Sequence, residues 1–270
     1  MARSYLFVDG NNILHRAYHA KKRTMSPDAP PEQAVAQTVR QAMSMIETAR
    51  MAHSPHVTVV TFDGGGDALG RSEVYPNYKA KRLRLDDDRK IINLAITEAH
   101  SRMVVAPATF VLSVPGYESD DVIATLAATA ESRSESAVLM SNDKDLLQCL
   151  SPFVSVRQPQ NGGGYTLTTP QDFKGKYGYD YQYLPTYKAL AGDESDSIGG
   201  VPKIGPVHAI RLIEQYGDLD DIYESIQFVM PRDVRNRLIE NFDLAYTCLK
   251  ISTVCRTVPI GANLLGHVFR

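Results

Sequence analysis

Short apolar runs that end at acidic residues constrain the fold of this chain more than any other feature of its sequence. YLFVD ends at Asp9, VTVVTFD ends at Asp63, and AVLMSN is followed by Asp143 and Asp145. Runs of this length that are β-branched or aromatic and bounded by turn residues are typical of buried strands. The sequence therefore predicts strands over residues 4–9, 57–63 and 137–141.

Helical patterns separate these runs, over roughly 32–52, 90–104 and 118–131. Strands that alternate with helices form a mostly parallel sheet with helices on both faces. The carboxyl ends of parallel strands meet along one edge, where ligands bind in such folds. We therefore expect an α/β fold class, with a mostly parallel central sheet whose acidic residues share one edge.

The character of the sequence changes at about residue 181, after which helices joined by glycine turns follow, with one further candidate strand at 257–260. We predict an α/β core over 1–180 and a helical part over 181–270. No apolar stretch approaches the ~20 residues of a membrane span, and the break at Asp9 argues against a signal peptide. Three scattered cysteines favour reduced thiols in a cytosol.

The candidate site consists of nine acidic residues: Asp9, Asp63, Glu118, Asp120, Asp121, Asp143, Asp145, Asp193 and Asp196. Carboxylates that converge in one cleft repel each other and raise their own pKa values. Hard divalent cations relieve this repulsion, because they take oxygen ligands and neutralise the charge. The pattern therefore indicates a metal-dependent site for phosphate chemistry. Any one of these acids could instead be a helix cap or a surface charge, as the spacing of Glu118 and Asp121 at a helix start illustrates.

The net charge of -2 is unlike that of most nucleic-acid-binding proteins, whose surfaces are basic. Of the 31 acidic residues, nine belong to the candidate site, which leaves 22 acidic against 29 basic residues elsewhere. The small negative net charge of the chain therefore allows an acidic pocket set in a basic surface.

Five segments carry a resemblance to a known family: FVDGNNILHRAYHA (7–20), FDGGGDALGRSEVYPNYKAKR (62–82), PGYESDDVIATLA (115–127), SNDKDLLQCL (141–150) and LAGDESDSIGGVPKIG (190–205). In this order they resemble the 5′-nuclease or flap endonuclease family, particularly the 5′-nuclease domain of bacterial DNA polymerase I and the free-standing phage 5′-3′ exonucleases. The resemblance covers most of the chain. It implies a PIN-like 5′-nuclease core followed by a helical part that contains a helix–three-turn–helix.

The resemblance also implies two groups of metal ligands. The first contains Asp9, Asp63, Glu118 and Asp120, with Asp121 close by, and the second contains Asp143, Asp145, Asp193 and Asp196. Two Mg²⁺ or Mn²⁺ ions about 4 Å apart would orient and deprotonate water and stabilise the leaving 3′ oxygen. A potassium ion at the carbonyls of the helical hairpin is implied as well.

A basic stretch over about 71–90 resembles the arch that guides a single strand in this family. Lys79 and Arg82 match the family pattern YK-x-x-R, which implies catalytic contact with the scissile phosphate. Further DNA contacts are assigned to Arg71, Tyr78, Lys81 and Arg84. A solvated charged loop is the alternative for the stretch, and core packing is the alternative for Tyr78.

Basic residues also follow the first motif. Lys21, Lys22 and Arg23 are candidates for contact with the DNA backbone, with a solvated turn as an equal alternative, and Arg16 is a weaker candidate. For His15 and His19 a structural role is the better interpretation.

The segment GGVPKIGPVHA (199–209) resembles the DNA-binding hairpin of the family. Glycines let the backbone approach closely, and the amides that open the next helix can hold a duplex phosphate. We assign DNA contact to Gly200, Lys203 and Gly205, with an ordinary glycine turn as the alternative. Lys203 stands where the family usually has glycine, so it adds a positive charge and loses backbone freedom.

These features predict a structure-selective 5′ nuclease with 5′-3′ exonuclease and 5′-flap endonuclease activity, which leaves 5′-phosphate and 3′-hydroxyl products. Expected substrates are DNA with 5′ ends, flaps or junctions, and RNA–DNA hybrids. We expect a free-standing enzyme, since no polymerase segment follows residue 270. We also expect a monomer, in the cytoplasm of a bacterial or phage-infected cell and without membrane association. The alternatives are a non-catalytic DNA-structure-binding module, disfavoured by the complete set of acids, and a PIN-like ribonuclease, disfavoured by the chain length and the hairpin.

Overall fold

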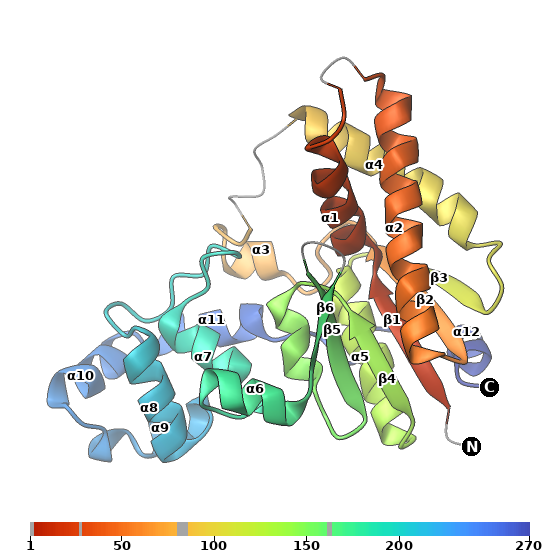
Figure 1. Ribbon diagram of the computed structural model, residues 1–270. Helices are drawn as coiled ribbons and strands as arrows, with labels where there is room; N and C mark the ends of the chain where they lie inside the picture. The colour runs from red at the N-terminus through yellow and green to blue at the C-terminus, as the bar shows by residue number, and fades with distance from the viewer. Residues whose placement is uncertain (1–2, 27–28, 80–85, 161–163) are drawn as a thin grey trace. The chain divides into compact units, whose positions relative to one another are not determined.

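The computed structural model describes residues 3–26, 29–79, 86–160 and 164–270, and the chain divides into two compact units (Figure 1). The first unit comprises residues 1–68, 85–168 and 255–270, and the second comprises residues 69–84 and 169–254. Each unit has a hydrophobic core of its own.

A six-stranded sheet forms the centre of the first unit. Its strands are β1 (Ser4–Asp9), β2 (Val57–Asp63), β3 (Thr109–Val114), β4 (Ser136–Met140), β5 (Val154–Pro159) and β6 (Tyr165–Thr168). They lie in the order β3-β2-β1-β4-β5-β6, and all neighbours are parallel except β5 and β6. The order reverses between β1 and β4, so the edge where such sheets bind ligands lies outside the carboxyl ends of these two strands. The predicted mostly parallel α/β sheet is confirmed.

Helices cover the sheet (Figure 1). They are α1 (Gly10–Lys22), α2 (Pro31–His53), α4 (Asp86–Met103), α5 (Ser119–Ser132) and α12 (Ala262–Val268). Side chains alternate along β1, because successive residues of a strand point to opposite faces. Leu6 and Val8 join the core formed with α1, α2 and α4. Tyr5 and Phe7 form an aromatic cluster with Phe269, whose ring centre lies 4.8 Å from that of Tyr5. The C-terminal segment therefore belongs to the first unit.

The turn from β1 into α1 places Asp9 at the carboxyl edge of the sheet. Asp9 caps α1, since its side chain accepts a hydrogen bond from the Asn12 amide. A Cβ atom at Gly10 would lie 2.4 Å from the Phe62 ring, so only glycine allows the helix to begin this close to β2.

The second unit is helical. Its helices are α3 (Arg71–Val74), α6 (Pro170–Tyr177), α7 (Leu184–Ala191), α8 (Pro206–Tyr216), α9 (Leu219–Glu224), α10 (Arg232–Glu240) and α11 (Phe242–Ser252). Apolar side chains from α7, α8, α9 and α11, such as Leu190, Leu212 and Ile222, form its core. The predicted helical C-terminal part is confirmed, whereas residues 257–260 form no strand. None of the described helices is long and apolar enough to cross a membrane.

Candidate active site

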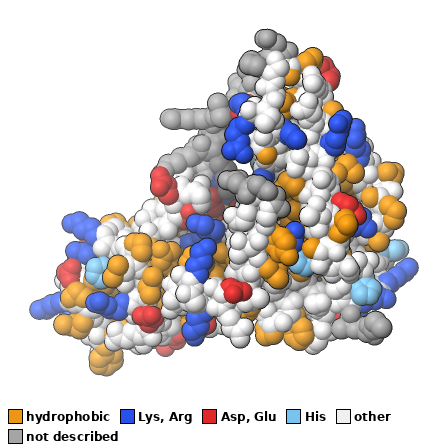
Figure 2. Space-filling view, viewed as in Figure 1, with side chains coloured by type: hydrophobic (Ala, Val, Ile, Leu, Met, Phe, Trp, Pro, Cys, Tyr) orange, Lys and Arg blue, Asp and Glu red, His pale blue; other side chains and the backbone are white. Residues whose placement is uncertain are grey.

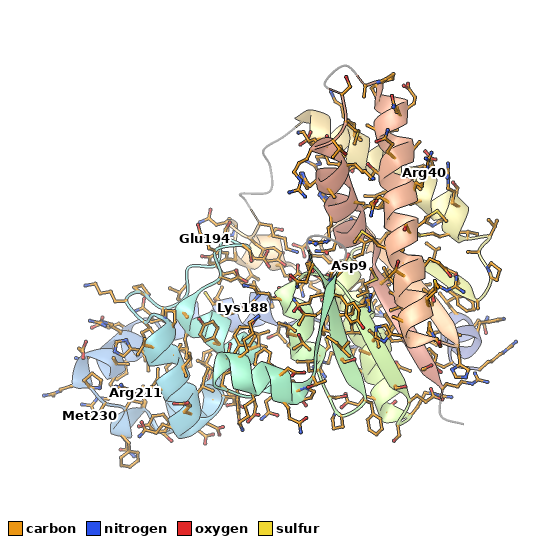
Figure 3. All side chains as sticks on the ribbon, viewed as in Figure 1. Asp9, Arg40, Lys188, Glu194, Arg211 and Met230 are labelled. Carbon is orange, nitrogen blue, oxygen red and sulfur yellow. The ribbon has the colours of Figure 1, made fainter. Side chains whose placement is uncertain are left out.

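Asp9 is the buried centre of the candidate site, with 4% of its surface exposed (Figure 3). Its Oδ1 accepts hydrogen bonds from the Asn12 amide at 3.0 Å and from Ser119 Oγ at 3.3 Å. Its Oδ2 accepts a hydrogen bond from Ser141 Oγ at 2.8 Å. Three segments distant in sequence therefore meet at the end of β1.

Asp63 lies at the end of the neighbouring strand and is linked to the same group. Its Oδ1 accepts a hydrogen bond from the Ser119 amide at 2.9 Å, and its Oδ2 accepts one from Asn11 Nδ2 at 3.0 Å. Ser119 thus contacts Asp9 through its hydroxyl and Asp63 through its amide. This double contact fixes the start of α5, with Glu118 at its N-cap and Asp120 in its first turn, beside both strands.

Asp143 and Asp145 follow β4 in a 3₁₀ turn. The Asp143 amide donates to Ser141 Oγ at 3.0 Å, and Asp143 Oδ1 accepts the Asp145 amide at 2.9 Å. Ser141 therefore joins Asp9 to the segment that carries the next two acids. Asp121 is fully buried, and its Oδ1 accepts the Cys255 amide at 2.7 Å, so this carboxylate holds the returning C-terminal segment.

Burial raises the pKa of Asp9 from its ordinary 3.8 to about 6. Hydrogen bonds from Asn12 and Ser141 lower this pKa, and the negative charges of Asp143 and Asp63 raise it again. Three of the predicted acids are therefore close enough to interact. This is the mutual repulsion expected of converging carboxylates.

The donor set suits a hard divalent cation, although no ready-made cluster is present. Among the described residues, no three acidic, His or Cys side chains are close enough to hold a metal ion as they stand. The oxygens of Asp9 and Asp63 accept hydrogen bonds from serine and asparagine side chains instead. A cation would relieve the raised pKa of Asp9, because carboxylate oxygens are the ligands that Mg²⁺ prefers.

The second unit holds Asp193 and Asp196. Asp193 forms an ion pair with buried Lys188, with Nζ 2.5 Å from Oδ2, and its Oδ1 accepts hydrogen bonds from the amide and hydroxyl of Ser195. Burial alone would raise the pKa of Asp193, but Lys188 and Ser195 outweigh it and hold the pKa below its usual range. Asp196 is buried as well. A backbone bridge between Asp193 and Ile198 closes this turn.

Part of the predicted arch belongs to the same unit. The Lys79 amide donates to the Asp196 carbonyl at 3.0 Å, and Lys79 has a positive φ of 54°. Lys79 Nζ lies 4.9 Å from the centre of the Tyr78 ring. Arg71 is buried, and its Nη2 donates to the Thr253 carbonyl at 3.1 Å, so it lies inside the unit. Three further predicted residues lie outside the described part of the chain: Lys81, Arg82 and Arg84.

The predicted hairpin connects α7 to α8. Gly200 has a φ of 66°, and a Cβ atom there would lie 2.4 Å from the Gly192 amide nitrogen, so the close approach requires glycine. Gly205 directly precedes α8. Lys203 is exposed and also has a positive φ, 62°, which explains why glycine is usual in the family at this position.

Sequence reasoning missed the residues that hold the acids in place. Ser119, Ser141 and Asn11 bind the carboxylates of the first unit, and Lys188 binds Asp193. Both serines are next to or near predicted acids in the sequence, in ESDD and SND, and this adjacency was the only signal available. Nothing in the local sequence indicated that Lys188 is buried.

Two family models match the chain along almost its whole length. Residues 4–178 match the 5′-3′ exonuclease, N-terminal resolvase-like domain, and residues 180–268 match the 5′-3′ exonuclease, C-terminal SAM fold. The chain belongs to the 5′-3′ exonuclease family. The predicted family is confirmed, and with it the predicted enzyme class at the level of the family.

Curated relatives of this 5′-3′ exonuclease family member fall into two kinds. A 5′-3′ exonuclease of Aquifex aeolicus is 30% identical over 91% of this chain and 81% of its own length. DNA polymerase I of Caldicellulosiruptor bescii is 30% identical over 96% of this chain, and the thermostable DNA polymerase I of Thermus aquaticus is 32% identical over 92%. The chain spans only 30% and 28% of these two polymerases.

Solved structures share the fold. The bacteriophage T5 D15 protein, co-crystallised with metal ions, matches with a TM-score of 0.76 and 21% identity over 98% of this chain and 97% of its own. The T5 D15 flap endonuclease in a pseudo-enzyme–product complex with DNA and metal ions matches with a TM-score of 0.74 and 22% identity, over 98% and 96%. At 21% and 22% identity, these two matches show that this chain shares the fold of the T5 proteins.

Proposed function

We propose that this chain is a divalent-metal-dependent 5′ nuclease that hydrolyses phosphodiesters of DNA. It releases nucleotides from 5′ ends and cuts 5′ flaps near duplex junctions, leaving 5′-phosphate and 3′-hydroxyl ends. The observation that carries the proposal is that, in a chain of the 5′-3′ exonuclease family, Ser119 links Asp9 to Asp63 and Ser141 links Asp9 to the Asp143 segment. DNA polymerase I relatives support a role in DNA replication and repair.

The proposed cofactor is a pair of Mg²⁺ or Mn²⁺ ions. Its proposed ligands in the first unit are Asp9, Asp63, Glu118, Asp120, Asp121, Asp143 and Asp145. In the second unit, Asp193 and Asp196 are candidate ligands on the resemblance alone. When bound, such a pair activates water and stabilises the leaving 3′ oxygen. The crystal structures of T5 proteins with metal ions support a metal-dependent reaction for this fold.

The chain's own side chains orient the acids and the substrate. Ser119 and Ser141 hold Asp9 through its two oxygens, which keeps a buried carboxylate in one orientation. We assign Lys79 to the scissile phosphate, together with Arg82, because a fixed positive charge stabilises negative charge that develops there. Tyr78 is assigned to single-strand stacking.

We propose that duplex DNA binds to the part of the chain from residue 181 onward. The hairpin offers the backbone of Gly200, the exposed charge of Lys203 and the amides that follow Gly205 at the start of α8. These contacts recognise phosphates and carry no sequence preference. A potassium ion at the hairpin carbonyls is part of the same proposal.

The deciding experiment is cleavage of a 5′-flap DNA labelled at its 3′ end, with Mg²⁺, with Mn²⁺ and with EDTA. Cleavage near the junction with either metal, and none with EDTA, is expected. Ligation of the product to an upstream 3′ end would confirm the 5′ phosphate. Duplex binding with no cleavage in either metal would favour a non-catalytic DNA-binding module, and preferential cleavage of single-stranded RNA would favour a ribonuclease.

A further inference from the structure

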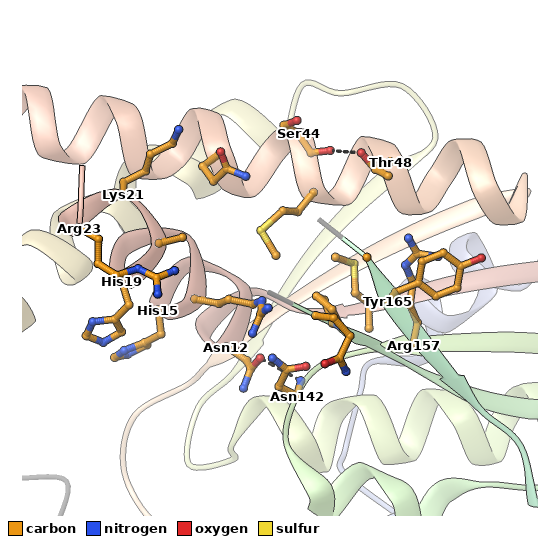
Figure 4. A pocket seen from close by; sticks show the side chains of 18 of the residues that line it. Asn12, His15, His19, Lys21, Arg23, Ser44, Thr48, Asn142, Arg157 and Tyr165 are labelled. Carbon is orange, nitrogen blue, oxygen red and sulfur yellow. Dashed lines mark hydrogen bonds between the residues drawn. The ribbon is translucent and has the colours of Figure 1, made fainter. Parts of the chain in front are cut away.

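A basic hollow lies in the first unit beside α1 and α2. Its volume is about 1050 Å³, and its lining comes from α1, α2 and the strands β4, β5 and β6 (Figure 4). No described residue of this lining is acidic, whereas five are Lys or Arg: Arg16, Lys21, Lys22, Arg23 and Arg157. Figure 2 shows Lys and Arg side chains gathered over α1. The hollow therefore suits an anionic ligand.

Arg157 on β5 is a buried cation without an acidic partner among the described residues. It is 3% exposed, its Nη1 donates to His53 Nε2 at 3.0 Å, and its guanidinium lies 3.4 Å from the centre of the Tyr165 ring. Its buried Nε has no hydrogen-bond partner within the described chain. A buried charge is costly unless it is paired, so an anion that enters the hollow would stabilise this guanidinium.

The contact with His53 does not compensate the positive charge of Arg157. Burial, and then the charge of Arg157, lower the pKa of His53, which keeps the imidazole neutral at neutral pH. Its Nε2 therefore accepts the hydrogen bond from Arg157 and leaves the positive charge uncompensated.

The opposite end of the hollow is also basic. Lys21 and Arg23 have no acidic partner in the part of the chain that the structure describes, whereas Lys22 pairs with Asp88 at 2.7 Å. Burial, and then the charge of Arg23, lower the pKa of Arg16. Like charges gathered in this way attract an anion and repel other cations.

The shape of the hollow selects a linear polyanion. Lys21 and Arg23 lie at one end, Arg157 and Tyr165 lie at the other, and Asn12 and Asn142 lie between them (Figure 4). Separated cations match successive phosphates of a strand better than one isolated phosphate. The volume is near the upper end of small-ligand pockets, about 300–1,000 Å³, which fits a few nucleotides and not a duplex. The Tyr165 ring adds a surface on which a base can stack.

The hollow adjoins the carboxylates. The Asn12 amide donates to Asp9 Oδ1 at 3.0 Å, and the Asn12 side-chain oxygen accepts the Asn142 amide at 3.0 Å. We propose that the hollow binds single-stranded DNA on the 5′ side of the scissile phosphodiester, so that a 5′ flap lies between α1–α2 and β4–β6. This inference rests on the proposed nuclease function.

The test compares wild type, the double variant Lys21→Ala/Arg23→Ala, and Arg157→Gln on flaps of one and of about ten nucleotides with the same duplex. The expected loss in kcat/KM is about tenfold or more on the long flap and less than about threefold on the short one, because only the long flap reaches the distal cations. Arg40→Ala is the matched control, since Arg40 is an exposed cation of α2 outside the hollow (Figure 3). Equal losses on both flaps would overturn the proposal.

Binding without cleavage separates this inference from the nuclease proposal. A thymidine oligonucleotide of about ten residues with a 3′ fluorophore is titrated in EDTA, and its anisotropy is followed at several salt concentrations. The logarithm of the binding constant falls linearly with the logarithm of the salt concentration, and the size of this slope is the salt slope. The double variant should reduce the salt slope by about 1.4, because it removes two phosphate contacts of about 0.7 each. This result stands even if no substrate is cleaved. An unchanged slope, or equal competition by thymidine monophosphate at the same phosphate concentration, would reject a strand-binding hollow. If Arg157→Gln does not fold, the surface double variant decides alone.

Discussion

Lys188 Nζ lies 2.5 Å from Asp193 Oδ2, and both side chains are largely buried, with 7% and 14% of their surfaces exposed. A predicted metal ligand is therefore already paired with a lysine of the preceding helix. The pair neutralises a buried carboxylate at the start of the hairpin segment, and it gives Lys188 a structural role.

Replacing Lys188 with methionine should lower the free energy of unfolding by about 3 kcal/mol, because it leaves a buried carboxylate without its cation. Urea denaturation measures the change. Lys174→Met is the matched control, since Lys174 and Asp180 form an exposed pair that should contribute less than about 1 kcal/mol. Adding Asp193→Asn to Lys188→Met should recover part of the loss, and a fully additive double variant would contradict the pairing.

The raised pKa of Asp9 predicts a pH dependence of stability in the absence of metal. A carboxyl whose pKa is raised to about 6 in the folded chain binds its proton more tightly when folded. Its contribution to stability is therefore full below about pH 4 and is lost as the pH rises through 6. Between pH 4 and pH 7 in EDTA, wild type should therefore lose on the order of 3 kcal/mol of stability that Asp9→Asn does not lose. Measuring the free energy of unfolding of both proteins across this range checks the difference.

Divalent metal should reverse this difference at neutral pH. A cation that binds the ionised Asp9 stabilises the folded wild type and has little effect on Asp9→Asn, because ligands of the folded state alone add to its stability. Thermal unfolding of both proteins with and without Mg²⁺ checks this. Parallel pH profiles in EDTA, or equal stabilisation by Mg²⁺, would speak against Asp9 as a buried metal ligand.

The positive φ of Lys203 separates its backbone role from its charge. Lys203→Gly should raise the free energy of unfolding by about 0.5–1 kcal/mol, because the left-handed conformation costs a residue with a Cβ atom about 1–2 kcal/mol, and glycine's greater unfolded-state entropy offsets part of the gain. Lys203→Ala removes the same charge without this relief. Both variants should lower the salt slope of duplex binding by about 0.9, and an unchanged slope would remove Lys203 from the phosphate contacts.

Asp143→Asn should abolish most cleavage without unfolding the chain. The asparagine side-chain oxygen can still accept the Asp145 amide, so the 3₁₀ turn is retained while the negative charge is lost. We expect at least about a hundredfold loss in kcat on a 5′ flap, with duplex affinity within about twofold. Asp243→Asn, an exposed acid in the first turn of α11, is the control. Near-normal turnover of Asp143→Asn would refute its assignment as a metal ligand.

The strands with strong patterns were predictable, and the weaker ones were not. The strands 4–9 and 57–63 occur as predicted, and β4 begins one residue earlier than expected, at Ser136. β3, β5 and β6 were missed. β6 is mostly exposed, and its sequence YTLT lacks the continuous apolar run that marks a buried strand. β3 has a short apolar run, Phe110–Leu112, but its burial is incomplete.

Local patterns and the order of the motifs were enough to predict the strands that end at acidic residues, the helical second part and the family. The tertiary structure alone decided which groups hold the acids. Ser119 reaches both Asp9 and Asp63, and Lys188 is buried against Asp193. It also decided that Arg157 faces a basic hollow without an acidic partner among the described residues. Burial and hydrogen bonding between residues distant in sequence depend on how the strands and helices pack, and no local pattern records that packing.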